Sequence, residues 1–383
     1  MDSVALLERL VSFPTISRNS NLDLIFFVRD FLAARKLEST LYMDPTGRKA
    51  NLFATVGPGD RPGIMLSGHT DVVPVEGQAW TTDPFRLTYQ GDRLLGRGTA
   101  DMKGFIACAL RAADQAASRS LSTPLHLAFS YDEEIGCVGV RSLIDALEDS
   151  PIRPALAIIG EPTSMRVALG HKGKTALRAT CRGREAHSSL APDSLNAIHL
   201  AMDFISRLRT RQDELATSGA QDSYYDIPYS TLHVGRISGG VALNIVPNHC
   251  ALDFEIRNIA ANDPAHILGQ LQEDAARIAS QARTRFPEAE IEIALTNEYP
   301  GLDMPAEAES VALLQSLTGE NDLIKLAYGS EGGLFHNRLG IPAIVCGPGS
   351  IEQGHKPDEY VTRDQLRRCD DMLDRLVEIM AGG

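Results

Sequence analysis

The sequence predicts an α/β protein in which a mostly parallel sheet is interrupted by an inserted α+β domain. Apolar, strand-like runs alternate with helical segments over residues 1–173, and the same alternation resumes at about residue 299. Between them, residues 174–298 follow the order βαββαβ, which is typical of a ferredoxin-like domain. We therefore expect one domain formed by residues 1–173 and 299–383, and a second domain formed by residues 174–298.

In the first of these domains, apolar residues at helical spacing predict helices over residues 23–35 and 103–117. The apolar run at residues 341–346 predicts a core strand. Short connections rich in Gly and Pro separate the segments, as expected where strands and helices alternate.

The inserted domain begins with residues 175–182, where apolar and polar residues alternate as in a half-buried strand. One helix is expected from Ser194, a candidate N-cap, to about residue 209. A second is expected over residues 263–284, with Pro264 at its first position. The remaining strands are expected over residues 230–237, 249–257 and 290–295.

Composition narrows the class of protein. The chain has 383 residues, 43% hydrophobic and 23% charged, which is an ordinary globular balance at a length that favours two domains. The formal net charge of −13 argues against nucleic-acid or anionic-membrane partners, because both attract basic patches. No apolar run is long enough for a membrane span, and the acidic, amphipathic start does not resemble a secretory signal. The six cysteines form no CxxC pair, so buried free thiols and a cytoplasmic location are expected.

Five apolar runs each lead to an acid or a histidine. The runs begin at residues 63, 93, 125, 155 and 341, and they lead in turn to His69, Asp101, the pair Glu133 and Glu134, Glu161 and His355. Open α/β sheets build their sites at the carboxyl edge of the strands, so we expect these side chains to gather there. Two histidines and several carboxylates without cysteine suit a hydrolytic Zn²⁺, Co²⁺ or Mn²⁺ centre.

Each residue also has a less specific interpretation. Asp71 lies two residues after His69, so it could orient the imidazole of a metal ligand, or it could simply cap a strand end. Asp101 could bridge two cations or cap the following helix. Glu133 and Glu134 point in different directions, so one could ligate a metal while the other acts as a general base, or both could belong to a solvated loop. The coincidence of five such strand ends favours the metal site.

The chain also resembles a known family. The motifs, in order, are Gly-His-Thr-Asp at 68–71, Gly-Thr-Ala-Asp-Met-Lys-Gly at 98–104, Asp-Glu-Glu-Ile-Gly at 132–136, Gly-Glu-Pro-Thr at 160–163 and Gly-His-Lys-Pro-Asp at 354–358. They resemble those of the dinuclear M20 metallopeptidases, which include carboxypeptidase G2, aminoacylase-1, succinyl-diaminopimelate desuccinylase and acetylornithine deacetylase. One departure is Gly354, where the family pattern leads us to expect Ala.

The resemblance implies a role for each motif. His69 and Glu161 would hold one metal ion, Glu134 and His355 the other, and Asp101 would bridge them. Two Zn²⁺ ions per subunit are expected, and Co²⁺ could substitute.

Beside these ligands, Asp71 would orient His69 and Glu133 would be the general base and acid. The peptide bond between Asp101 and Met102 is expected to be cis. The domain of residues 1–173 and 299–383 would be a phosphorylase/hydrolase-like catalytic domain. The inserted domain would be a lid, and two subunits would form a homodimer through it.

Further positions are implied to meet the substrate. His187 would stabilise the oxyanion, commonly in the active site of the partner subunit. Substrate contacts are expected from Asn244, Arg257, Lys172, Gly329 and Ser330, with Arg257 a candidate clamp for the α-carboxylate or, equally, a surface charge at a strand end.

Within the family, the resemblance is greatest to the acetylornithine deacetylase branch, on segments 17–21, 44–54, 170–173, 186–192 and 346–353. It implies a hydrolase of linear amide bonds that removes the acetyl group from N2-acetyl-L-ornithine in arginine biosynthesis. Alternatives are another N-acyl-amino-acid deacylase, a desuccinylase or a dipeptidase of the same family. A non-catalytic binding homologue or a structural protein is disfavoured, because every ligand position and the general base are present.

Overall fold

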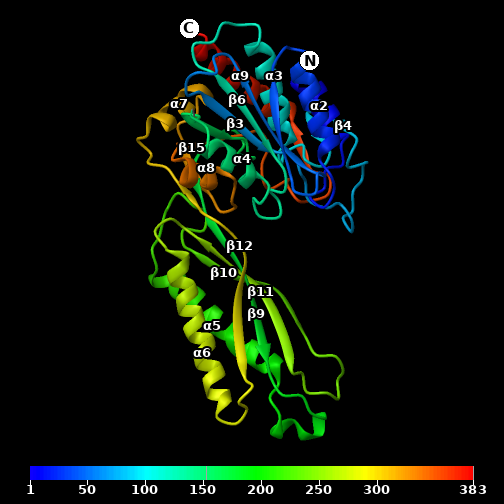
Figure 1. Ribbon diagram of the computed structural model, residues 1–383, viewed down its shortest axis with the longest axis vertical. Coiled ribbons are helices and arrows are strands. Elements are labelled where there is room, and N and C mark those ends of the chain that lie inside the picture. Colours follow the sequence, from blue (N-terminus) through cyan, green and yellow to red (C-terminus); the bar gives the residue numbers. More distant parts are fainter. Residues whose placement is uncertain (152, 383) are drawn as a thin grey trace. The chain divides into compact units, whose positions relative to one another are not determined.

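The computed structural model describes residues 1–151 and 153–382, and this part of the chain divides into two compact units. The first unit comprises Met1–Gly170, Leu302–Lys325 and Ser330–Gly383. The second comprises His171–Gly301 together with Leu326–Gly329. Figure 1 colours both units along the sequence.

The first unit is built on a mixed sheet whose central strands are parallel. Its strands follow the order β1-β2-β6-β3-β7-β15-β8-β13, with β14 paired to β8. Neighbours β6, β3, β7 and β15 are parallel, while β1, β2 and β8 pair antiparallel. The bounds are β1 Ser39–Met43, β2 Ala50–Val56, β3 Ile64–His69, β6 Leu125–Ser130, β7 Leu156–Ile159, β8 Val167–His171, β13 Leu302–Asp303, β14 Leu323–Leu326 and β15 Ala343–Val345.

Helices cover this sheet, and every residue of β6 and β7 is buried, as in strands covered on both faces. One group of helices, α1, α3 and α9, packs together, and α3 lies against β3 and β6. Helix α4 packs against α8 and β2. The bounds are α1 Ser3–Val11, α2 Leu22–Ala33, α3 Lys103–Ala116, α4 Val140–Glu148, α7 Glu309–Thr318, α8 Gly332–Leu339 and α9 Arg363–Met380.

The run that leads to Asp101 does not join this sheet, so the expectation of five strand ends on one edge was wrong in this one case. Only β5, Arg93–Leu95, forms there, and it belongs to a small antiparallel sheet of order β16-β5-β4 with β4 Thr88–Gln90 and β16 Tyr360–Thr362. The chain turns at Gly98, whose φ of 83° lies in the left-handed region that favours glycine. Asp101 therefore reaches the site from a loop rather than from a strand of the large sheet.

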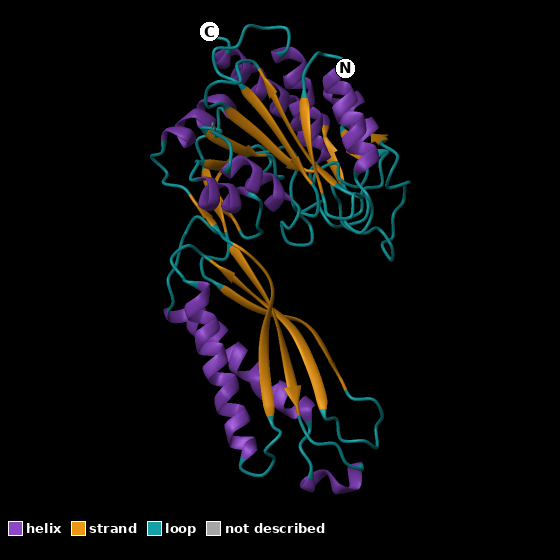
Figure 2. Ribbon diagram, in the orientation of Figure 1, coloured by secondary structure: helices purple, strands orange, loops and turns teal. Residues whose placement is uncertain are grey.

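The second unit has the expected βαββαβ order, and its sheet follows the order β10-β11-β9-β12. Both helices lie on one face of this sheet (Figure 2). Buried and less buried residues alternate along β9 and β11, which is typical of a sheet with one covered face. The bounds are β9 Gly173–Arg182, η1 Ser188–Asp193, α5 Ala197–Ser218, β10 Thr231–Gly239, β11 His249–Asn258, α6 Pro264–Arg283 and β12 Glu290–Tyr299.

The two long helices of the second unit each begin at a side-chain cap. Asp263 accepts a hydrogen bond from Ala265 N and Pro264 is the first helical residue, as expected. For α5 the expected cap was wrong: Asn196, not Ser194, accepts from Ile198 N at 2.9 Å. Ser194 donates instead to Ala191 O, which closes the preceding turn.

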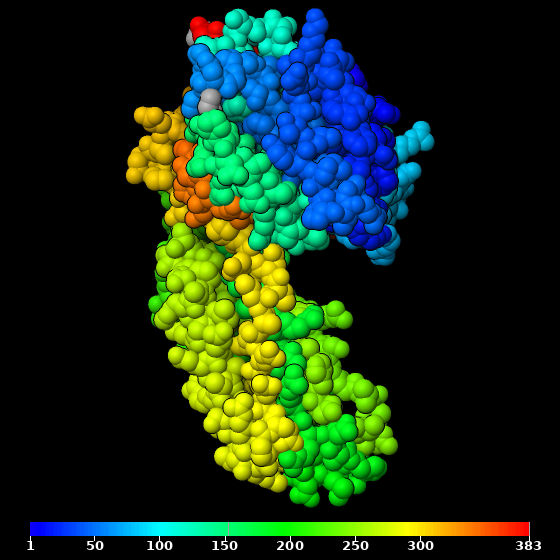
Figure 3. Space-filling model, in the orientation of Figure 1, coloured from blue at the N-terminus to red at the C-terminus, as the bar shows by residue number. Residues whose placement is uncertain are grey.

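Figure 3 shows that most of the surface of the second unit comes from its long segment, His171–Gly301, coloured green to yellow. All six cysteines are free and buried, as predicted. Among the described residues, no helix combines the length and apolarity that a membrane crossing needs.

Candidate metal centre

Parallel strands carry most of the predicted ligands to one place in the first unit. His69 is the last residue of β3, Glu133 and Glu134 follow the end of β6, and Glu161 follows β7. His355 lies in the loop after β15. Because β6, β3, β7 and β15 are adjacent and parallel, their carboxyl ends meet at one edge, as expected.

Asp101 lies between the two histidines. His69 Nε2 is 3.0 Å from Asp101 Oδ1, and His355 Nε2 is 3.2 Å from Asp101 Oδ2. Each carboxylate oxygen thus faces a different imidazole, which is the arrangement that a bridging ligand needs. The peptide bond between Asp101 and Met102 is cis, as predicted.

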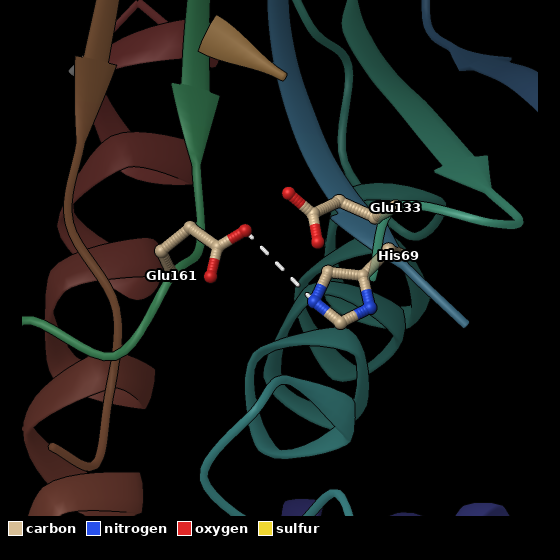
Figure 4. Close-up of side chains that lie close together, drawn as sticks. All are labelled: His69, Glu133 and Glu161. Atoms are coloured by element: carbon tan, nitrogen blue, oxygen red, sulfur yellow. Dashed lines mark ion pairs between the residues drawn. The ribbon is translucent and has the colours of Figure 1, made fainter. Parts of the chain in front are cut away.

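The remaining acids complete two overlapping groups. His355 Nε2 lies 2.9 Å from Glu134 Oε2, and His69 Nε2 lies 3.9 Å from Glu161 Oε1. Glu133 and Glu161 both approach His69 (Figure 4). In each of two sets, the candidate ligand atoms lie within 4.8 Å of one another; the sets are His69, Glu133 and Glu161, and His69, Asp101 and Glu134.

The donor chemistry fits a pair of divalent cations. Imidazole and carboxylate are ligands of Zn²⁺ and Co²⁺, and neither candidate set among the described residues includes a cysteine. The two sets share His69, so two candidate positions lie side by side at this imidazole. Glu133 is within ligand distance in one set, so its position suits either direct ligation or proton transfer beside a metal ion.

The electrostatics of the site call for added positive charge. Burial, reinforced by neighbouring acids, raises the pKa of Glu133 to about 8 and that of Glu134 to about 7. Burial and the charge of Asp101 also raise the pKa of Glu161. Hydrogen bonds to Asp101 and Glu134 raise the pKa of His355 to about 11. In the absence of metal, these groups therefore retain protons that a divalent cation would displace.

Asp71 acts on the site in a different way from the one expected. His69 Nδ1 donates to the main-chain O of Asp71 at 2.9 Å, whereas the nearest carboxylate oxygen is 3.6 Å away. The carboxylate instead accepts from Ser17 Oγ at 2.7 Å and from the main-chain N–H groups of Glu133 and Glu134, at 3.1 and 3.3 Å. The Asp71 carboxylate thus fixes the backbone of the acidic pair, while the main-chain O of Asp71 holds the His69 ring with Nε2 towards Asp101.

Three buried groups near the site were missed by the sequence reasoning. Glu331 accepts a 2.5 Å hydrogen bond from Ser130 Oγ, and burial raises its pKa to about 7. Cys137 Sγ donates to Glu133 Oε1 at 3.2 Å. Glu359 accepts from the backbone of the Asp101 loop. Their positions in the sequence could have indicated them. Cys137 and Glu359 each directly follow a family motif, and Glu331 directly follows the expected substrate residues Gly329 and Ser330.

His187 belongs to the second unit, at the start of η1. Its side chain is exposed, and Nδ1 accepts from Ser189 N and lies 2.8 Å from Ser189 Oγ. Asn244 is exposed beside it, where its carbonyl accepts from Ser188 N. The metal groups of the described residues lie wholly in the first unit, so the structure does not join His187 to them.

The other expected substrate residues divide between the units. Arg257 and Gly329 meet at Tyr299 in the second unit: Arg257 Nη1 donates to Tyr299 Oη at 2.9 Å, and a Cβ on Gly329 would approach that ring to 2.2 Å. Lys172 is buried and donates to Tyr229 O at 2.6 Å. Ser330 is buried in the first unit, where its Oγ accepts from Gly332 N.

Comparison with known proteins identifies the family to which the chain belongs. The sequence model of peptidase family M20/M25/M40 matches residues 65–379. The chain belongs to peptidase family M20. Its curated M20 relatives include the acetylornithine deacetylases of Proteus mirabilis (strain HI4320), 34% identical over 98% of this chain and 96% of the relative, and of Pasteurella multocida (strain Pm70), 33% identical over 96% and 95%.

Solved structures support the same fold. The M20 family metallo-carboxypeptidase Sso-CP2 from Sulfolobus solfataricus matches with a TM-score of 0.81, at 18% identity and over all of both chains. This M20 protein is therefore a metallohydrolase by family, with a dinuclear site whose candidate ligands are the His, Asp and Glu groups described above.

Proposed function

We propose that this M20 hydrolase is a zinc-dependent acetylornithine deacetylase, which cleaves N2-acetyl-L-ornithine to L-ornithine and acetate. Similarity to two acetylornithine deacetylases over nearly the whole chain carries the proposal of substrate. The cluster of buried acids around His69 carries the proposal of metal-dependent hydrolysis.

The proposed ligands are His69 and Glu161 for one ion, Glu134 and His355 for the other, and Asp101 between them. The opposed 3.0 and 3.2 Å contacts of Asp101 with the two histidines support this division. When bound, two divalent ions would supply Lewis acidity that activates water and polarises the amide carbonyl.

Glu133 is proposed to take a proton from the attacking water and to pass it to the leaving α-amine. A carboxylate with a pKa near 8 holds a proton strongly enough to deliver it at neutral pH, and a cation nearby would favour its ionised form for the first step. Asp71 would keep Glu133 in place through the main-chain N–H of that residue.

The second unit is proposed to supply the groups that bind the rest of the substrate. His187 would donate a hydrogen bond to the oxyanion, and Arg257 would pair with the α-carboxylate through its planar guanidinium group. The pairing of Arg257 with Glu255 and Tyr299 in the structure favours a fixed position for this cation over a free surface charge.

We propose that the second unit also forms a homodimer. Val241 and Leu243, in the loop between β10 and β11, are 88% and 100% exposed. Ile237 and Ile245 beside them are also exposed, and such a group of apolar side chains is typical of a protein–protein contact. Sedimentation of the wild-type protein and of Val241→Asp/Leu243→Asp tests this: we expect a dimer and a monomer respectively, and a monomeric wild type would contradict it.

A substrate panel on protein reconstituted with Zn²⁺ or Co²⁺ tests the activity. N2-acetyl-L-ornithine, N-acetyl-L-methionine, N-succinyl-diaminopimelate and dipeptides should be compared by kcat/KM. We expect acetylornithine to be preferred at least tenfold. A preference for another member of the panel would support the hydrolase activity but contradict acetylornithine as the substrate. Inactivity of the metal-loaded protein on every member would contradict both the activity and the substrate.

A further inference from the structure

The loops that carry Asp101 and His355 are joined by hydrogen bonds, buried at Glu359 and more exposed at Gln78, that no proposed catalytic step uses. Glu359 and Arg97 are each 1% exposed, although both are charged. Burying a charged side chain costs free energy unless its hydrogen-bond partners compensate for the lost water. The partners of Glu359 and Arg97 therefore indicate which segments these two side chains hold in place.

Glu359 is bonded to the Asp101 loop through both carboxylate oxygens. Oε2 accepts from Arg97 Nη1 at 2.7 Å and from Gly98 N at 2.9 Å. Oε1 accepts from Ala100 N at 2.9 Å and from Asp101 N at 3.0 Å. Four charge-assisted bonds fill the acceptor sites of the carboxylate, so the main chain of Asp101 has little freedom to move.

Arg97 continues the connection on its other side. Its Nη2 donates to Gln78 Oε1 at 2.5 Å, and Trp80 Nε1 donates to the same oxygen at 3.0 Å. With its oxygen facing two donors, the amide of Gln78 must present its nitrogen elsewhere. That nitrogen, Nε2, donates to the main-chain O of His355 at 2.9 Å.

The His355 loop has a conformation that needs such support. His355 and Asp358 have φ of 62° and 55°, in the left-handed region that side-chain-bearing residues rarely adopt. The Asp358 carboxylate accepts from Thr81 N and Thr81 Oγ1, both at 2.9 Å, so the segment that contains Gln78 holds this loop at a second point.

We propose that Glu359, Arg97 and Gln78 form a brace that sets the distance between the main chains of Asp101 and His355, and thereby the affinity of the metal ion that these two residues share. The three are positioning residues, because none of them reaches the proposed ions. The inference rests on the proposed metal ligands. It goes beyond them in giving Gln78, a residue outside every motif, control over metal affinity.

The test is a titration of metal-free protein with Co²⁺, followed by its absorption spectrum and by elemental analysis of the bound ions. Gln78→Ala and Arg97→Lys each cut the brace and keep the charge of the site. We expect each to bind one ion normally and the other about tenfold more weakly. The melting temperature of Gln78→Ala should stay close to that of the wild type. Gln90→Ala, on exposed β4, is the matched control and should bind both ions as the wild type does.

A double variant distinguishes a connected brace from two independent effects. Because both substitutions cut the same connection, Gln78→Ala/Arg97→Lys should bind the second ion about as weakly as the weaker single variant. Fully additive losses, or wild-type affinity in Gln78→Ala, would overturn the brace.

His355→Ala, titrated alongside, keeps the two levels of inference apart. Loss of one ion in His355→Ala with wild-type binding in Gln78→Ala overturns the brace alone. Two ions bound by His355→Ala would overturn the ligand assignment, and the brace with it.

Discussion

Both units contain buried acids, but the acids of the candidate metal centre lack the arginine partners that a buried acid of the second unit has. Asp274, on α6, is fully buried and pairs with Arg207, Arg211 and Arg277. In the first unit, Asp101, Glu133, Glu134 and Glu161 have no lysine or arginine within ion-pair distance among the described residues. A buried acid with its own arginines serves the fold, whereas buried acids without a cation require one from outside.

The largest test of this difference is Glu133→Gln. The substitution removes the proposed base and keeps its size, so kcat should fall by about 10²–10⁴-fold. Elemental analysis should find metal content close to that of the wild type. A metal-replete variant with full activity would remove Glu133 from proton transfer.

His187→Ala tests whether the second unit contributes to the chemistry as well as to the fold. Loss of one oxyanion donor should lower kcat by about 10²–10³-fold with unchanged metal binding. If His187 acts in the partner subunit, heterodimers made by refolding it with Glu133→Gln should regain part of the activity. Inactive heterodimers of demonstrated composition would argue against a shared site.

The stability of two variants tests the comparison directly. Asp274→Asn removes the buried counterion of three partly exposed arginines and should lower the free energy of unfolding by about 1.5–3 kcal/mol, with or without metal. Glu161→Gln removes an acid that has no lysine or arginine partner and whose pKa is raised by burial, so the metal-free protein should be at least as stable as the wild type. Urea unfolding of both metal-free variants measures this, and equal losses would show that the two kinds of acid are equivalent.

The pH dependence of stability should also reveal the unpaired acids. Glu133 and Glu134 have folded-state pKa values raised to about 8 and about 7, so between pH 4.5 and 8 the folded protein holds protons that the unfolded chain releases. Stability of the metal-free protein should therefore fall as pH rises through this window. Metal binding, which displaces those protons, should become tighter. Thermal melts with and without Zn²⁺ at pH 5.5 and 8 measure both trends, and a stabilisation by Zn²⁺ that is larger at pH 5.5 would contradict the prediction.

Gly354→Ala should have the smallest effect. Its φ is not in the left-handed region, and a Cβ would lie 3.3 Å from Ile351 Cδ1 and 3.5 Å from Asp101 Oδ2. We expect wild-type metal content and a change in stability of less than about 1 kcal/mol, because alanine also restricts the unfolded chain. Loss of a metal ion would show that the His355 loop tolerates no side chain at this position.

The sequence predicted the site better where the ligands end regular strands than where they lie on loops. His69, Glu134 and Glu161 follow strands whose apolar runs are unambiguous, so their meeting at one edge follows from parallel pairing. The route of Asp101 was mispredicted, because a three-residue strand and a glycine turn leave no periodic signal. The brace could not be foreseen either, since Gln78 and Glu359 are linked only through Arg97 in the folded chain, and a partly exposed glutamine carries no pattern of its own.

The small segment Leu326–Gly329 has a practical consequence for dividing the protein. Although it lies within the sequence of the first unit, its backbone belongs to the second, where Leu326 O accepts from Lys172 N at 3.1 Å and Gly329 packs against Tyr299. In a fragment cut at residues 171 and 301, the main-chain N–H of Lys172 would lose its acceptor and the ring of Tyr299 would lose the backbone that covers it. A separately expressed second unit should therefore carry residues 326–329 on a designed linker, and a circular permutant should leave the chain uncut at this point.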